Sequence, residues 1–128
     1  MGLLSIELAE SEVNKWIEAR KTRSSVVEAN SDNITALVDG FKDGLLSLNE
    51  DNTITQTLLH PIEGLKTIKY KDRLSGFEKQ KHTSRAGSDV HSQIMALLSA
   101  LSGENSALLN KLDTDDIGVI RSLTSFFF

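Results

Sequence analysis

The sequence predicts an α+β fold that is mostly helical, with one β-hairpin at about residues 53–70 packed against about five helices. Two observations lead to this class. Apolar side chains recur at helical spacing on both sides of the hairpin, whereas the hairpin residues are rich in β-branched side chains and alternate between apolar and polar. A lone two-stranded hairpin is only marginally stable in water, so this one has to pack on helices or pair with strands of a second copy.

Residues 6–29 are predicted as one amphipathic helix. A polar break at residues 30–33 ends it and supplies the N-cap of a second helix. The second helix has the clearest period in the chain, because its apolar residues follow one stripe over residues 34–48. Gly40 and Gly44 lie on the flank of this stripe, where they indicate close helix packing.

Residues 53–59 and 65–70 are the predicted strands, and the turn between them, at residues 60–64, contains the only proline of the chain. The segment that follows, residues 71–88, is polar, basic and weakly patterned. We expect a mobile loop there, with one helical turn near residues 74–77.

Three helices are predicted in the last third of the chain. One covers residues 90–101, between a polar cap and Gly103, which is a typical helix-ending residue. A short helix follows at residues 106–112. The last helix begins at Asp113, where acidic side chains suit the positive end of the helix dipole. Its apolar face comprises Ile117, Ile120, Leu123 and Phe127.

Composition restricts the function classes. The 128 residues suffice for one domain with a sizeable core, alone or with a small appendage. The absence of cysteine excludes disulfides and thiolate metal sites, and is compatible with a reducing cytoplasm. No apolar run approaches the roughly 18–20 residues that span a bilayer. The N-terminal residues turn acidic without a basic segment and do not predict a signal peptide.

The net charge of −4 is unevenly distributed. Residues 1–51 carry ten acidic and five basic side chains, residues 66–85 carry seven basic against two acidic ones, and residues 86–128 carry five acidic and two basic ones. The basic middle predicts either a solvated loop that steers neighbouring subunits or an anion-binding strip. The strip has few aromatic residues and the chain is acidic, which argues against a dedicated nucleic-acid binder.

No residue pattern predicts a catalytic, cofactor-binding or metal site, and we expect a protein that is not an enzyme. His60, His82 and His91 lack a second ligand at helical spacing. The three aspartates within residues 113–116 lack the spacing of an EF-hand and are better explained as helix-capping acids. Glycine-rich phosphate loops and nucleophile elbows are also missing from the sequence.

Several motifs in the second part of the chain follow one another in a characteristic order. Residues 53–71 combine a strand, a Pro-Ile turn with a glycine, and a strand that runs into basic residues. Residues 97–103 read Leu-Leu-x-x-Leu-x-Gly, and residues 109–116 read Leu-x-x-Leu-x-x-x-Asp. With the aromatic terminus, this order resembles the small tail assembly chaperones of Mu-like and P2-like contractile-tailed phages. The chain departs from that family at residues 71–74, where an Arg-x-Pro step is missing.

The resemblance covers about residues 52–128 and leaves residues 1–51 as an added N-terminal helical hairpin. It implies a non-enzymatic protein, without cofactors, that binds and solubilises the apolar tape-measure protein and helps to recruit the tail-tube protein. Such chaperones act in the cytoplasm of the infected host and are absent from the mature virion. Many also occur in a longer form made by ribosomal frameshifting, which slippery codons at Phe126–Phe128 would permit here.

The candidate partner-contact residues are the large apolar side chains, since an apolar groove can shield a helix that would otherwise aggregate. For each of them the alternative is ordinary core packing. Phe127 continues the face of the last helix and is expected in the core, whereas Phe126 and Phe128 are better contact candidates. The full set is Trp16, Ile17, Phe41, Leu98, Leu101, Phe126, Phe127 and Phe128.

Two other functions remain open at this point. One is a structural tail or neck component that stays in the virion and self-assembles through hairpin pairing. The other is a small nucleic-acid-binding regulator that uses the basic strip at residues 66–85.

Overall fold

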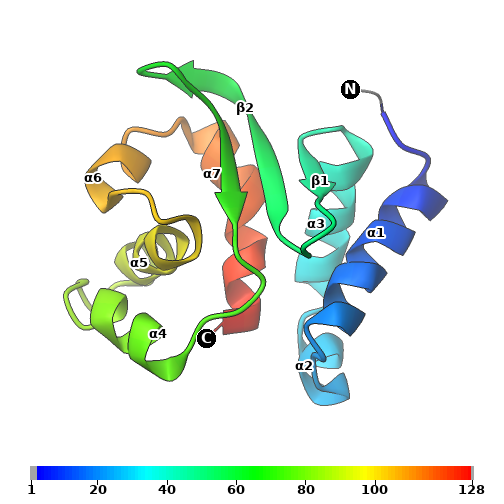
Figure 1. Cartoon of the computed structure of the whole chain (residues 1–128), viewed down its shortest axis with the longest axis horizontal. Helices are drawn as coiled ribbons and strands as arrows, with labels where there is room; N and C mark the ends of the chain where they lie inside the picture. Colours follow the sequence, from blue (N-terminus) through cyan, green and yellow to red (C-terminus); the bar gives the residue numbers. More distant parts are fainter. Residues whose placement is uncertain (1–2, 128) are drawn as a thin grey trace.

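A computed structural model describes residues 3–127 as a mostly helical α+β fold with a three-stranded sheet, which confirms the predicted class (Figure 1). The sheet has one strand more than the predicted hairpin, and the described residues form more helices than the five expected. The α-helices are α1 (Ile6–Ala19), α2 (Ser24–Ala29), α3 (Ser31–Lys42), α4 (Gly76–Thr83), α5 (Val90–Ser102), α6 (Ser106–Leu109) and α7 (Thr114–Ile120). The strands are β1 (Leu46–Leu48), β2 (Ile54–Ile62) and β3 (Leu65–Tyr70), and a 3₁₀-helix, η1 (Arg121–Phe127), continues α7.

The single helix expected at residues 6–29 is divided into α1 and α2 by a corner at Lys21. Lys21 has a left-handed backbone, with a φ of 55°. Its N–H donates to the carbonyl of Glu18, and the N–H of Thr22 donates to that of Ile17. This is the Schellman pattern of a helix end, here with lysine in the place that glycine usually takes. No glycine marks the corner in the sequence, which explains why the prediction missed it.

The second helix was predicted to reach residue 48, but α3 ends at Lys42. Gly44 has a φ of 74°, its N–H donates to the Phe41 carbonyl, and the next N–H donates to the Gly40 carbonyl. Gly44 is therefore the stop residue of α3 and lies outside the helix. The apolar residues after it form strand β1 instead.

Strand β2 lies at the centre of the sheet, between β1 and β3, and both pairings are antiparallel. The turn between β2 and β3 consists of Glu63 and Gly64, both with positive φ, as a tight hairpin turn requires. The predicted turn at residues 60–64 was too long, because residues 60–62 belong to β2. Proline at position 61 is tolerated there because the β2–β3 register is interrupted between Thr57 and Ile62.

Helix α4 occupies the segment that was expected to be mostly loop. Ser75 caps it, and the Ser75 and Glu78 side chains each bond the other's backbone N–H in a capping box. Of the later elements, α5 and α7 begin where predicted, whereas α6 ends three residues before the expected residue 112 and the last helix becomes 3₁₀ after Ile120. Asp89 caps α5, Gly103 ends it with a φ of 75°, and Asp113 caps α7.

The hydrophobic core is continuous across the boundary expected between residues 51 and 52. That boundary falls in the connection between the paired strands β1 and β2. In Figure 1, α1 and α3 lie at one end of the molecule and α4, α5 and α6 at the other, with α7 and η1 running between them. The fully buried side chains come from both parts, including Trp16, Leu37, Phe41, Ile54, Tyr70, Leu97, Leu109 and Leu123.

Candidate functional site

The predicted partner-contact residues lie in the core of the molecule. Trp16, Ile17, Phe41, Leu98, Leu101, Phe126 and Phe127 are all buried, with at most 8% of each residue exposed. Phe128 lies outside the described residues. Phe126 was expected to be a better contact candidate than Phe127, but both are buried, and the Phe126 ring packs edge-on against Trp16 at a centroid distance of 5.2 Å. In this conformation these residues leave little of their surface for a partner, so other residues have to supply most of such a surface.

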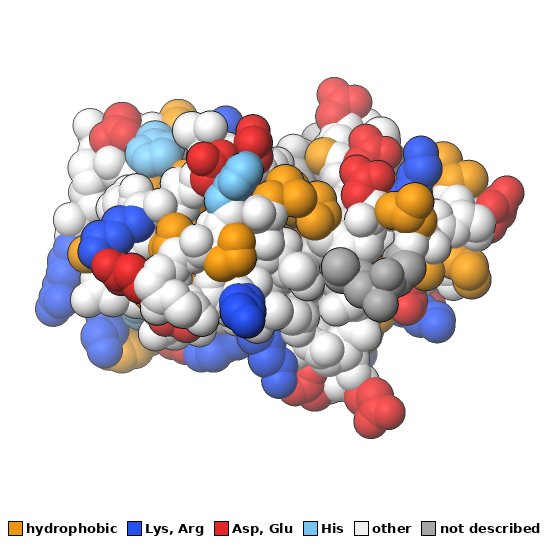
Figure 2. Space-filling model, turned by 90° about the horizontal axis from the view of Figure 1, so that it is seen from above, with side chains coloured by type: hydrophobic (Ala, Val, Ile, Leu, Met, Phe, Trp, Pro, Cys, Tyr) orange, Lys and Arg blue, Asp and Glu red, His pale blue; other side chains and the backbone are white. Residues whose placement is uncertain are grey.

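Apolar side chains that remain exposed are scattered. Figure 2 shows several small apolar groups on one face of the molecule, separated by charged and polar side chains, rather than one broad patch. The largest exposed apolar residues are Leu3, Ile6, Leu8, Leu59, Phe77 and Val90.

Arg20, at the end of α1, ties the first part of the chain to the last. Its guanidinium lies over the rings of Trp16, Phe126 and Phe127, at 5.2, 5.8 and 4.6 Å from their centroids. It donates hydrogen bonds to the backbone carbonyls of Asp72 and Phe126. These five contacts fix the side chain in one orientation, so its charge is held in place rather than freely solvated.

The electrostatic surroundings of Arg20 are unfavourable to its charge. Burial is the largest cause of a lowered pKa, and the nearby positive charge of Arg73 lowers it further, while Asp72 opposes both effects. Arg73 in turn donates to the Arg20 carbonyl at 3.2 Å. Two guanidinium groups are thus held near one another at this corner of the molecule.

A cavity of about 310 Å³ opens beside these two residues, and we call it the Arg20 hollow. Cations line it from the α1–α2 corner, from the segment before α4 and from α4 itself, whereas none of the lining residues is acidic. Among the described residues, none of these cations forms an ion pair within 4 Å. The lining cations are Arg20, Lys21, Arg23, Arg73 and Lys79, and the apolar lining residues are Val26, Leu74, Phe126 and Phe127.

The basic strip at residues 66–85 is divided by the fold. Lys69 pairs with Asp51, and Lys71 pairs with Glu78. Arg73 and Lys79 line the Arg20 hollow, whereas Lys81 and Arg85 line a separate cavity of about 380 Å³ between α4 and α5. The strip is therefore not a single surface, because α4 turns its side chains in different directions.

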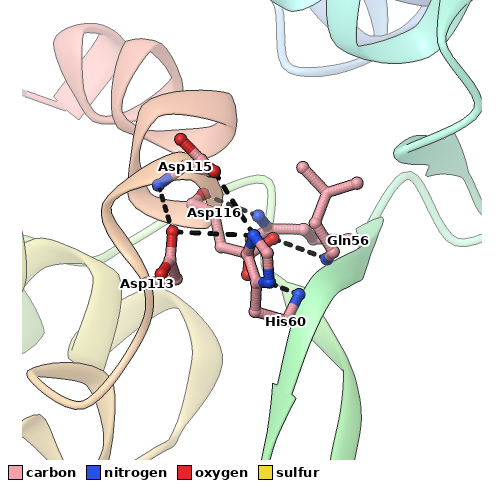
Figure 3. A network of polar contacts seen from close by, with 6 residues as sticks. Gln56, His60, Asp113, Asp115 and Asp116 are labelled. Atoms are coloured by element: carbon pink, nitrogen blue, oxygen red, sulfur yellow. Dashed lines mark hydrogen bonds and ion pairs between the residues drawn. The ribbon is translucent and has the colours of Figure 1, made fainter.

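A buried polar network joins the sheet to α7 (Figure 3). The Tyr70 hydroxyl donates to Gln56 Oε1 at 2.9 Å. Gln56 Nε2 donates to the Asp116 carbonyl at 2.8 Å, a contact drawn in Figure 3. The Asp116 carboxylate accepts from the backbone N–H of Leu59 at 2.7 Å and of His60 at 3.0 Å. Gln56, Tyr70 and Asp116 are each fully buried, so every polar group in this network needs its partner.

The irregular end of β2 explains why Asp116 is buried. Thr57 pairs with Thr67 and Ile62 pairs with Leu65, so four residues of β2 face one residue of β3. The extra amides of Leu59 and His60 would lack acceptors in the ladder, and the carboxylate on α7 supplies them. Asp116 thus belongs to the acidic first turn of α7 and also fixes the irregular end of β2. We call this pair of carboxylate–amide bonds the Asp116 clamp.

His60, Asp113 and Asp115 meet at the surface above this clamp (Figure 3). His60 Nε2 lies 3.3 Å from Asp115 Oδ2 and 3.8 Å from Asp113 Oδ2, and one ligand atom of each residue lies within 4.8 Å of the others. The Asp113 carboxylate already caps α7 through the Asp115 N–H. All three side chains are substantially exposed, and helix capping with a surface contact between His60 and the two carboxylates accounts for the arrangement.

Sequence reasoning missed Gln56, Tyr70 and Asp116 as a connected group. One signal for Gln56 was available, because it occupies an inward position between the apolar Ile54 and Leu58 on the alternating strand. Asp116 had been grouped with its exposed neighbours, and no local pattern distinguishes it from Asp115. The interrupted register that requires the carboxylate is visible only in three dimensions.

Comparison with protein-family models finds no match, and comparisons with curated proteins and with solved structures find no significant similarity. Among residues 3–127, no helix is both long and apolar enough to cross a bilayer. The function is therefore argued from the residues themselves.

Proposed function

We propose that the chain is a non-enzymatic phage tail assembly chaperone that binds and solubilises the tape-measure protein and helps to recruit tail-tube subunits. It would act in the cytoplasm of an infected bacterium and be absent from the mature virion. The proposal starts from the motif order at residues 52–128, which resembles that of these chaperones.

One structural observation supports the proposal most directly. The aspartate of the Leu-x-x-Leu-x-x-x-Asp motif is Asp116, and its carboxylate holds the strand that opens the resemblance, through the amides of Leu59 and His60. The other motif, which ends at Gly103, forms the buried helix α5 with its left-handed stop. Motifs that are separate in the sequence thus belong to one packed structure. This is expected if the motif order at residues 52–128 reflects a common fold.

Two features of the structure bear on the alternative functions. A nucleic-acid-binding regulator is less well supported, because the basic strip is split between ion pairs and two separate cavities. A structural component that self-assembles through hairpin pairing could use β3. The strand order is β1-β2-β3, so β3 is an edge strand of the sheet, whereas β2 is paired on both sides. This alternative is tested together with the leading proposal.

Co-expression with a phage tape-measure protein tests the proposal. We expect the tape-measure protein to be insoluble alone and to be recovered as a soluble complex with this chain. Tape-measure protein that stays insoluble in both cases would contradict the chaperone function. Mass spectrometry of purified tails distinguishes the structural alternative, because a chaperone is missing from finished particles whereas a tail component is retained.

A further inference from the structure

We propose that the Arg20 hollow binds an acidic peptide segment, with carboxylates against its cations and an apolar side chain against its apolar wall. The inference concerns the ligand class of this cavity. It does not depend on the phage function, and it holds whichever protein carries the segment.

The hollow is strongly positive. Five cations from three stretches of chain line a cavity of about 310 Å³, and among residues 3–127 no acidic side chain lines it. Gathering like charges opposes folding, and the pKa of Arg20 is lowered by burial and by Arg73. The Asp72 carboxylate, which also accepts a hydrogen bond from the Asn52 amide at 3.1 Å, offsets part of this effect at Arg20 but does not line the hollow. A bound anion would relieve this repulsion.

The cations of the hollow are held in place before any ligand binds. Arg20 is fixed by its hydrogen bonds to Asp72, Thr22 and Phe126 and by the rings beneath it. The adjoining Lys21 and Arg23 belong to a corner whose backbone is set by the helix-end bonds of α1. A ligand therefore meets charges that are already positioned, and it loses less ordering free energy on binding than it would on a flexible surface.

The lining of the hollow suits a peptide better than a nucleic acid. Its accessible apolar part comes mainly from half-buried Val26 and Leu74, with a small contribution from Phe126 and Phe127, and it can accept an aliphatic side chain. The two phenylalanine rings are at least 92% buried and provide no platform on which bases could stack. The chain is acidic overall, and α1 carries four glutamates outside the lining, so a phosphate backbone that extends past the hollow meets repulsion.

The test uses the full chain and a short fluorescein-labelled peptide in which Asp and Glu flank a central Leu-Phe pair. We expect saturable binding by fluorescence anisotropy that weakens as the salt concentration rises. Binding should also change the emission of Trp16, the only tryptophan, because Arg20 lies between its ring and the hollow. An Asn/Gln version of the peptide should not bind, and a version with Ser-Gly in the centre should bind more weakly.

A matched pair of charge reversals locates the site. Arg23→Glu with Lys79→Glu removes two lining cations and should weaken peptide binding by about tenfold or more. Lys42→Glu with Lys66→Glu makes the same change of net charge at exposed positions outside the hollow and should change binding less than about threefold. Circular dichroism checks that both variants fold.

Three results would overturn the inference. One is an equal loss of binding in both double variants, which would show attraction to the whole molecule rather than to the hollow. Another is tighter binding of a single-stranded DNA oligonucleotide than of the acidic peptide, when both probes carry the same net charge. The third is no saturable peptide binding by the unaltered chain at low salt. Each of these is distinct from failure of tape-measure co-expression.

Discussion

Asp116 is the residue on which the junction of sheet and helices depends most. Its buried carboxylate accepts two backbone N–H groups that have no strand partner. Asp116→Ala leaves both donors without an acceptor, and we expect a loss of about 2 kcal/mol or more in the free energy of unfolding. Asp116→Asn keeps one acceptor and should lose less. Urea denaturation measures both variants, and Asp115→Ala, at the exposed neighbouring position, is the control that should change stability little.

Tyr70 provides a pH-dependent prediction at the same scale. Burial is the main cause that raises its pKa, and the negative charges of Asp116 and Glu104 add to it. Because the folded-state pKa exceeds the unfolded value of about 10, the contribution of the neutral phenol is complete below about pH 10 and is lost at higher pH. Tyr70 is the only tyrosine, so phenolate absorbance reports on it alone. We expect its ionisation only when the protein unfolds in alkali.

The variant Tyr70→Phe separates this ionisation from the hydrogen bond. At neutral pH it should be less stable by about 1–2 kcal/mol, because buried Gln56 Oε1 loses its donor. Above about pH 10 the stability difference from the unaltered chain should narrow, since the variant has no phenol to ionise. Urea denaturation as a function of pH measures this difference, and a constant gap up to the alkaline transition would contradict the assignment.

Single residues were the least predictable part of the molecule. Large apolar residues such as Trp16 and Phe41 were recognised from their spacing, but spacing alone left open whether they face the core or a partner. The structure buries both of them. The side chains that line the Arg20 hollow come from residues 20–26, 73–79 and 126–127, and only the folded chain brings these stretches together.

At the scale of elements, substitutions at the ends of α1 and α5 should change the stability of the protein in opposite directions. Gly103 ends α5 with a φ of 75°, and an added Cβ would meet no atom within 4 Å, so Gly103→Ala introduces backbone strain alone. We expect it to destabilise the protein by about 1 kcal/mol. Lys21 holds the same conformation without glycine, so Lys21→Gly should stabilise by up to about 1 kcal/mol. Thermal unfolding of both variants in the absence of ligand measures the effects. A change of the melting temperature in the same direction for both variants would contradict the left-handed conformation assigned to the two helix ends.

End signals in the sequence were recognised for some elements and overlooked for others. For α5 a polar N-cap and a closing Gly103 were predicted, and the structure has Asp89 as the cap and Gly103 at the end. The residues of β1 were predicted as part of the preceding helix, because the leucines there extend its apolar stripe. In the structure the helix ends before Gly44, which has a left-handed backbone. The α4 helix has a Ser-x-x-Glu capping box that was overlooked amid weak apolar periodicity.

At the scale of the whole molecule, the two parts of the chain are joined by strand pairing, by aromatic packing and by hydrogen bonds, and α3 also packs against α7 and η1. Strand β1 pairs with β2, the Trp16 ring packs on Phe126, and Arg20 bonds the carbonyls of Asp72 and Phe126. A division into independent units at residue 52 would cut all of these contacts. The division at residue 52 stays a prediction. The packing of residues 3–127 instead predicts that the two parts of the chain fold together.

We therefore expect one cooperative unfolding transition for the full chain. Trp16 fluorescence reports on the first part and its contact with Phe126, while far-UV circular dichroism reports on all helices. The two transitions should coincide in urea, because each part buries the apolar surface of the other. A fragment of residues 52–128 should lack a cooperative transition, since it exposes the β2 edge that β1 covers and the Phe126 ring that Trp16 covers. Separate transitions, or a fragment with a cooperative transition of its own, would instead support two domains.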